Sequence, residues 1–107
     1  MQPAVSELIS LLDASASFLE SYREHTWSSR LRNNANLIEK DDTSGLENLF
    51  RSFGGMGSFN DLILHPINNH KLSEAEIDTA NIKLEEYRRE IYRLVSNLRR
   101  DSWKHSE

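Results

Sequence analysis

Cysteine is absent from this chain, and proline, glycine and long apolar runs are scarce. With no cysteine among 107 residues, a disulfide, a thiolate zinc site and a cysteine nucleophile are all excluded. No apolar run approaches the roughly 20 residues that a membrane-spanning helix needs. Residues 1–7 also lack the basic and apolar regions of a signal peptide. We therefore expect a cytoplasmic protein that does not enter a membrane.

The net charge of −4 is unevenly distributed along the chain. Residues 1–82 hold 6 Lys and Arg against 12 Asp and Glu, whereas residues 83–104 hold 7 against 4. A nucleic-acid-binding protein normally carries a dominant basic field. The acidic excess therefore argues against a nucleic-acid partner and favours a basic protein partner.

Apolar residues recur at steps of three and four in four segments. This spacing predicts helices at about 4–25, 27–40, 45–53 and 73–103, and no segment alternates as a strand does. A chain of this length is expected to form one domain, residues 1–107. We therefore predict an all-α fold class, a small helical bundle of about four helices with a Gly-rich loop between the third and fourth.

Two of the predicted helices carry sequence signals for their ends and surfaces. Ser44 with Glu47, and Ser73 with Glu76, have the spacing of a capping box. Opposite the apolar stripe of the last helix, charges of both signs alternate, which predicts a solvated, ion-paired face rather than paired catalytic carboxylates. The residues of this face are Glu85, Glu86, Arg88, Arg89, Glu90 and Arg93.

A glycine cluster between Phe53 and Phe59 is the most unusual segment of the chain. It contains three of the four glycines. One interpretation is an anion cradle built from the backbone N–H groups of residues 55–57. The favoured interpretation is a tight reversal, in which the two phenylalanines anchor the loop and Asn60 or Asp61 caps the next segment. The cluster matches neither the dinucleotide fingerprint nor the P-loop.

No set of residues has the spacing of a catalytic or metal site. His65, His70 and Asp61, with His25 further away, are possible metal ligands, but their spacing is wrong for a helical histidine pair. Ser58 near His65 and Asp61 lacks a nucleophile elbow and a strand to hold it. We therefore predict no catalytic residues, no metal and no cofactor, and a protein that is not an enzyme.

The segment from Leu37 to Leu64 resembles a family of short bacterial proteins of unknown function. These proteins share a helix, an acidic turn with a glycine, and an FGGMGSFND-type loop. The resemblance implies a small helical cytoplasmic protein, and some similar short bacterial proteins look like immunity proteins that neutralise a cognate toxin. The matching residues are Leu37-Ile38-Glu39-Lys40-Asp41-Asp42, Gly45-Leu46, Leu49-Phe50 and Phe53-Gly54-Gly55-Met56-Gly57-Ser58-Phe59-Asn60-Asp61-Leu62.

The leading functional hypothesis is a non-enzymatic protein-binding module, an immunity or antitoxin-like protein that neutralises a basic toxin. The blockade would be steric and electrostatic, since an acidic surface steers a basic partner. The acidic turn after the second helix and the adjoining glycine loop form the predicted contact region. Its residues are Asp41, Asp42, Glu47, Gly55, Met56, Ser58, Asn60 and Asp61.

Two alternative functions use other features of the sequence. One is a small-molecule or anion-binding domain, or a weak enzyme, that uses the glycine loop with Asn60, Asp61, His65 and His70. The other is a homodimeric structural module, because the stripe of the last helix is partly coiled-coil-like. The protein is accordingly expected to be a monomer or a homodimer.

Overall fold

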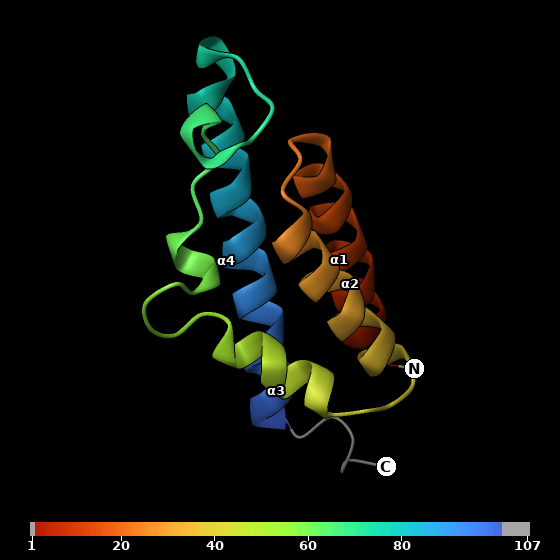
Figure 1. Cartoon of the computed structure of the whole chain (residues 1–107). Coiled ribbons are helices and arrows are strands. Elements are labelled where there is room, and N and C mark those ends of the chain that lie inside the picture. The colour runs from red at the N-terminus through yellow and green to blue at the C-terminus, as the bar shows by residue number, and fades with distance from the viewer. Residues whose placement is uncertain (1, 102–107) are drawn as a thin grey trace.

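The computed structural model describes residues 2–101, which contain four α-helices (Figure 1). These are α1 (Pro3–Ser21), α2 (His25–Glu39), α3 (Ser44–Arg51) and α4 (Ile77–Asp101). No strand occurs among the described residues, so the predicted all-α fold class is confirmed. The end of the fourth helix that the sequence places near residue 103 lies outside the described residues.

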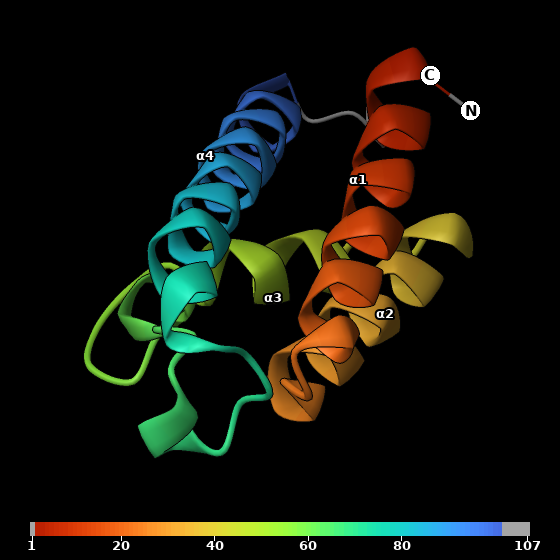
Figure 2. The same cartoon turned by 90° about the horizontal axis from the view of Figure 1, so that it is seen from above.

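α1 and α2 form an antiparallel pair that runs along one side of the bundle (Figure 1, Figure 2). α1 ends in a Schellman motif, in which the Glu24 N–H donates to Leu19 O at 2.9 Å, and α2 ends in the same way. The residue that makes the turn has a positive φ in both cases, 65° at Arg23 and 62° at Asp41. α1 therefore stops at Ser21, earlier than the predicted end near residue 25.

One cluster of buried apolar side chains joins the helices. The predicted stripe of α1 contributes Val5, Leu8, Leu12, Ala16 and Leu19, all fully buried. The predicted stripe of α4 contributes Ala80, Leu84, Ile91, Leu94 and Leu98. Since the chain's own helices cover the α4 stripe, a homodimer built on that stripe would first have to open the core.

α3 lies across the end of the bundle and connects α2 to α4 (Figure 2). It crosses α2 closely because Gly45 has no side chain at the contact. A Cβ atom at position 45 would lie 2.7 Å from Asn34 O and 2.9 Å from Leu37 Cβ. Distances this short are inside van der Waals contact, so any side chain at Gly45 would push α3 away from α2.

The capping box predicted at the start of α3 does not form. α3 begins at Ser44, and the Ser44 N–H donates to Asp42 Oδ1 at 2.9 Å. Glu47 turns instead toward α4, where the Arg99 guanidinium donates to its two carboxylate oxygens at 2.9 and 3.3 Å. The local pattern was wrong here because a bidentate pair with an arginine is stronger than a bond to a single backbone N–H.

The Glu47–Arg99 pair should make the α3–α4 contact depend on pH. The hydrogen bonds from Arg99 lower the pKa of the Glu47 carboxyl below its ordinary value of 4.5. A group with a lowered folded pKa contributes stability above its unfolded pKa and loses it as pH falls through the folded value. We expect Glu47→Gln to lower the free energy of unfolding at neutral pH, and this difference from the wild type to shrink below about pH 4.5.

Urea denaturation of both proteins across this pH range measures the effect. Glu39→Gln is the control, because Glu39 is exposed and forms no ion pair among residues 2–101. A difference between the wild type and Glu47→Gln that stays constant with pH would show that the ion pair does not act as described.

α4 is preceded by the capping box predicted at Ser73 and Glu76, which the structure confirms. The Ser73 N–H donates to Glu76 Oε1 at 2.9 Å, and the hydrogen bonds from Ser73 lower the pKa of the Glu76 carboxyl. A 3₁₀ turn, Glu74–Glu76, then leads into the helix. Neither α4 nor any other helix within residues 2–101 has both the length and the hydropathy needed to cross a membrane.

Candidate functional site

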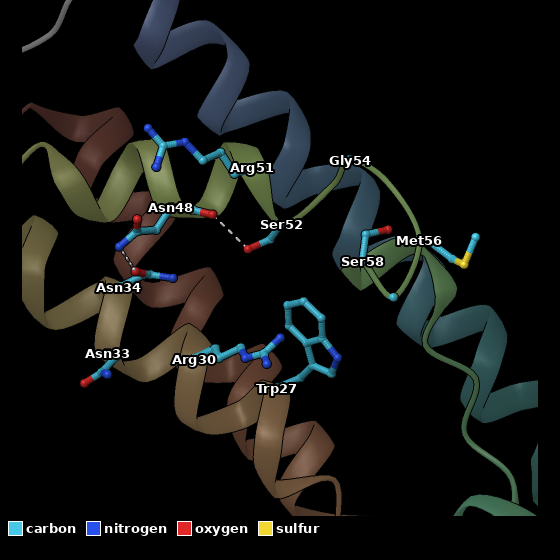
Figure 3. A pocket seen from close by; sticks show the side chains of 11 residues that line it. Trp27, Arg30, Asn33, Asn34, Asn48, Arg51, Ser52, Gly54, Met56 and Ser58 are labelled. Carbon is cyan, nitrogen blue, oxygen red and sulfur yellow. Dashed lines mark hydrogen bonds between the residues drawn. The ribbon is translucent and has the colours of Figure 1, made fainter.

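An open hollow lies between α2, α3 and the loop of residues 52–58 that follows α3 (Figure 3). Its volume is about 450 Å³, within the range of about 300–1,000 Å³ typical of small-ligand sites. We call it the α2–α3 hollow. It is lined by Trp27, Arg30, Asn33 and Asn34 of α2, by Asn48 and Arg51 of α3, and by Ser52, Gly54, Met56, Gly57 and Ser58 of the loop.

The loop of residues 52–58 reverses the chain in a defined conformation. Gly55 and Gly57 have φ values of 82° and 74°, in the left-handed region that glycine adopts without strain. At the base of the loop the Phe59 N–H donates to Ser52 O at 2.7 Å. A short 3₁₀ turn, Phe59–Asp61, follows and returns the chain to the core.

The carboxylate of Asp61 binds one of the backbone N–H groups that the anion-cradle interpretation assigned to an external anion. The Gly57 N–H donates to Asp61 Oδ2 at 2.7 Å. The Asn60 side-chain amide donates to Phe53 O at 2.9 Å and ties the turn back to the loop. The N–H group of Gly57 is therefore used within the chain, and the geometry is that of the tight reversal.

A cluster of aromatic rings packs against the α2–α3 hollow and fixes the position of Trp27, which lines it. The Trp27 ring stacks on Phe59 with centroids 4.9 Å apart, and Phe53 packs edge-on against Phe59 at 5.6 Å. Phe59 is fully buried and Trp27 is 8% exposed. The guanidinium of Arg30 lies 4.5 Å from the Trp27 ring centroid. A cation over an aromatic face is attracted to it, so the stack also orients Arg30.

Two asparagines connect the helical walls of the hollow (Figure 3). The Asn48 side-chain amide donates to Asn34 Oδ1 at 3.3 Å, and the Ser52 hydroxyl donates to Asn48 O at 2.8 Å. Asn34 is buried although it is polar. Its poor helix propensity is outweighed here by a contact between helices that the sequence pattern does not reveal.

The structure places the predicted loop residues at or beside the hollow. Met56 and Ser58 line it. Gly55 lies in the same loop, and Asn60 and Asp61 lie in the turn that follows. Met56 is fully exposed, whereas Ser58 is buried.

The predicted acidic residues do not line the hollow. Asp41 ends α2 in a left-handed conformation. Asp42 accepts the Ser44 N–H, and Glu47 binds Arg99 on the α4 side of α3. The acidic turn and the loop therefore lie at opposite ends of α3, with the acidic residues outside the hollow.

Arg88 is a buried structural residue, which corrects the prediction that it belongs to a solvated face of α4. It is 9% exposed. Its Nη1 donates to Phe59 O and to Leu62 O, each at 2.9 Å, and its Nη2 donates to Glu85 Oε2 at 2.9 Å. Arg88 therefore holds the turn after the glycine loop against α4.

His70 is also buried, and both of its ring nitrogens are engaged. Nδ1 accepts the His65 N–H at 3.0 Å, which leaves Nε2 to donate to Glu24 Oε1 at 2.9 Å. Glu24 Oε2 accepts the Trp27 N–H at 2.9 Å, so the same carboxylate caps α2. His70 thus fastens the segment before α4 to the start of α2, and neither nitrogen is left to bind a metal or to act as a base.

The residues of the small-molecule alternative do not share a cavity. Asn60 lines a cavity of about 220 Å³ beside Arg88, whereas His70 lines a separate hollow of about 700 Å³ near the end of α1. Among residues 2–101, no group of three or more His, Asp and Glu side chains is placed to hold a metal ion.

Sequence reasoning missed Arg30, Asn33 and Arg51. Within the described part of the chain neither arginine forms an ion pair and the Asn33 side chain forms no hydrogen bond. The sequence does indicate that Trp27, Arg30 and Asn34 share one face of α2, because they follow one another at steps of three and four. The sequence alone does not show that α3 and the loop enclose this face.

The family model of a domain of unknown function, DUF6966, matches residues 20–73. The chain belongs to this family. Every residue that lines the α2–α3 hollow falls within the matched segment of the DUF6966 domain, whereas α4 lies outside it. Searches of curated proteins and of solved structures found no match to the chain.

Proposed function

We propose that this DUF6966 protein is a non-enzymatic binding module that docks a protein partner over the α2–α3 hollow. One observation carries the proposal: a hollow of about 450 Å³ has Met56 on its rim, and its lining contains Arg30 and Arg51, which form no ion pair within residues 2–101. Met and Arg are enriched in protein interfaces, and exposed methionines adapt to different partners. Met56 is fully exposed on a structured loop, so it contributes nothing to packing within the chain.

The chemistry of the lining supports binding rather than catalysis. Its hydroxyl groups belong to Ser52 and Ser58, and no described His, Asp or Glu side chain lines the hollow with them. A serine nucleophile requires an adjacent general base.

A bacterial immunity or antitoxin-like role fits such a module, because a rigid protein that binds over a toxin's active site blocks it sterically and needs no catalytic residues. A cytoplasmic location and a toxin encoded by the neighbouring gene form part of the proposal.

A second candidate is neutralisation of a basic toxin through the acidic turn after α2. The net charge of −4 and the exposure of Asp41 and Asp42 favour it. In that case the contacts lie outside the hollow.

Site-specific photocrosslinking distinguishes the two candidates. A photoreactive amino acid replaces Met56 at the hollow, Thr43 in the acidic turn, or Ile67 as a control. Each variant is then co-expressed with the product of the neighbouring gene. Ile67 is 81% exposed, and its segment, Pro66–Asn68, lies at the other end of the bundle from α3 (Figure 1).

We expect a covalent complex from position 56 and none from position 67. A complex from position 43 alone would favour the basic-toxin candidate. If no position yields a complex, the protein is not a binding module for that partner.

A further inference from the structure

The charge of the α2–α3 hollow is opposite to that of the protein as a whole. The chain carries −4, yet the lining contains Arg30 and Arg51 and no carboxylate. Some arginines outside the hollow are neutralised locally: Arg32 binds Glu20, and Arg99 binds Glu47, with N–O distances of 2.9 Å. The cations of the hollow therefore form a local positive site on an acidic protein.

Arg30 is held in place, and its side chain donates no hydrogen bond within residues 2–101. Its guanidinium lies 4.5 Å from the Trp27 centroid, and Trp27 is itself fixed by its stack on Phe59. A planar guanidinium stacked on a ring keeps its N–H groups available at its edges, in a geometry that suits a carboxylate. Arg30 is exposed, so an incoming acceptor can reach these groups.

Arg51 and Asn33 add further donors at the edges of the hollow, where both side chains point away from Arg30 (Figure 3). Arg51 is exposed in the last turn of α3. Arg51 acts on Glu47 through its charge and helps to lower the pKa of that carboxyl, but the hydrogen bonds of Glu47 go to Arg99. Asn33 is exposed on the α2 side. The side chains of this site thus offer mainly N–H donors, which favour a ligand with many hydrogen-bond acceptors.

We infer that Arg30 and Arg51 receive the carboxylates of an acidic segment of the protein partner. This inference rests on the proposed function and names the chemistry of its partner. Two arginines on a protein of net charge −4 do not form the basic stripe that follows a phosphate backbone. Met56, on the loop side of the hollow, offers an exposed apolar contact, which suits a peptide chain with mixed side chains.

NMR titration of the full chain with a hexaglutamate peptide tests the inference. Chemical shifts of the Arg30 and Arg51 Nε–H groups and of the Trp27 indole report on the hollow. Hexalysine, an oligothymidylate and inorganic phosphate are the comparison ligands. The double variant Arg30→Gln/Arg51→Gln removes the site.

A control double variant removes the same charge elsewhere. Arg23→Asn/Arg89→Gln replaces two exposed arginines that form no ion pair within residues 2–101 and do not line the hollow. Asn is used at position 23 because φ is 65° there and Asn tolerates the left-handed region.

We expect hexaglutamate to shift the hollow signals, with binding weakened roughly tenfold in Arg30→Gln/Arg51→Gln and little changed in the control. An equal loss of hexaglutamate affinity in both double variants would show that only general charge attraction is involved, and it would overturn the inference. Stronger binding of the oligothymidylate or of phosphate would overturn the assignment to a protein carboxylate. If hexaglutamate fails while position 56 still crosslinks a partner, the inference falls and the proposed function stands.

Discussion

Gly45→Ala is expected to lower the free energy of unfolding by about 2–3 kcal/mol, the upper part of the range for overpacked cores. The added Cβ would lie 2.7 Å from the backbone oxygen of Asn34 and 3.0 Å from Ile38 Cγ1. A backbone oxygen in the middle of α2 cannot rotate away as a side-chain end can. α3 must therefore move off α2, and the α2–α3 hollow should widen with it.

Urea denaturation of Gly45→Ala measures this loss, and Gly54→Ala is the matched control. At Gly54 the nearest heavy atom to an added Cβ is Arg51 O, at an ordinary 3.8 Å, so this variant should stay within about 0.5 kcal/mol of the wild type. If both substitutions have the same effect, the crossing of α3 over α2 is not as close as described.

Arg88→Met is expected to lower the free energy of unfolding by about 2–4 kcal/mol, because it leaves one buried and two partly buried carbonyl groups without their charged donor. Arg88 Nη1 donates to the backbone oxygens of Phe59, Asn60 and Leu62 at distances of 2.9–3.3 Å. Within residues 2–101 the Arg88 Nε is buried without a partner. The substitution also removes this unpaired group, which offsets part of the cost. Methionine retains most of the apolar stem, so the loss reports mainly on the hydrogen bonds.

Denaturation together with hydrogen exchange tests the role of Arg88. Besides the global loss, exchange of the backbone amides in residues 59–62 should become faster than elsewhere. Arg89→Met is the control, because Arg89 is exposed and forms no ion pair in the described part of the chain, and it should change stability by less than about 0.5 kcal/mol. A cost for Arg88→Met no larger than that for Arg89→Met would contradict the anchoring role.

The helices could be read from the sequence because each has a long apolar stripe. On α4 the steps from Ala80 through Leu84 and Ile91 to Leu98 lie on a single buried face. The capping box at Ser73 and Glu76 is local as well, and it forms as expected. Features that depend on neighbours within a few residues were therefore predictable, except at Ser44 and Glu47, where the distant Arg99 binds Glu47 instead.

The end of α1 was harder to predict than that of α2, and neither helix has the usual glycine signal at its end. Arg23 and Asp41 make the left-handed turns, with φ values of 65° and 62°, where glycine is the common residue. Tertiary packing outweighs their reluctance to adopt this conformation. The glycine near these ends, Gly45, is needed for a close helix crossing instead.

The candidate site was only half visible in the sequence. The loop with Met56 and Ser58 stands out by its glycines, but Arg30 and Arg51 look like ordinary surface cations. Whether an arginine is free depends on partners far away in the sequence. Arg99 binds Glu47 across 52 residues of sequence, and only the fold shows that Arg51 has no such partner among residues 2–101.

The most direct measurement of the central claim, that the protein binds through the α2–α3 hollow, is the yield of covalent partner from the photocrosslinker at position 56 compared with position 67. Both positions carry large exposed apolar side chains, so nonspecific hydrophobic association would give similar crosslinking yields at both. We predict a clear adduct from position 56 and only background from position 67. Equal yields, or an adduct from position 67 alone, would contradict the claim.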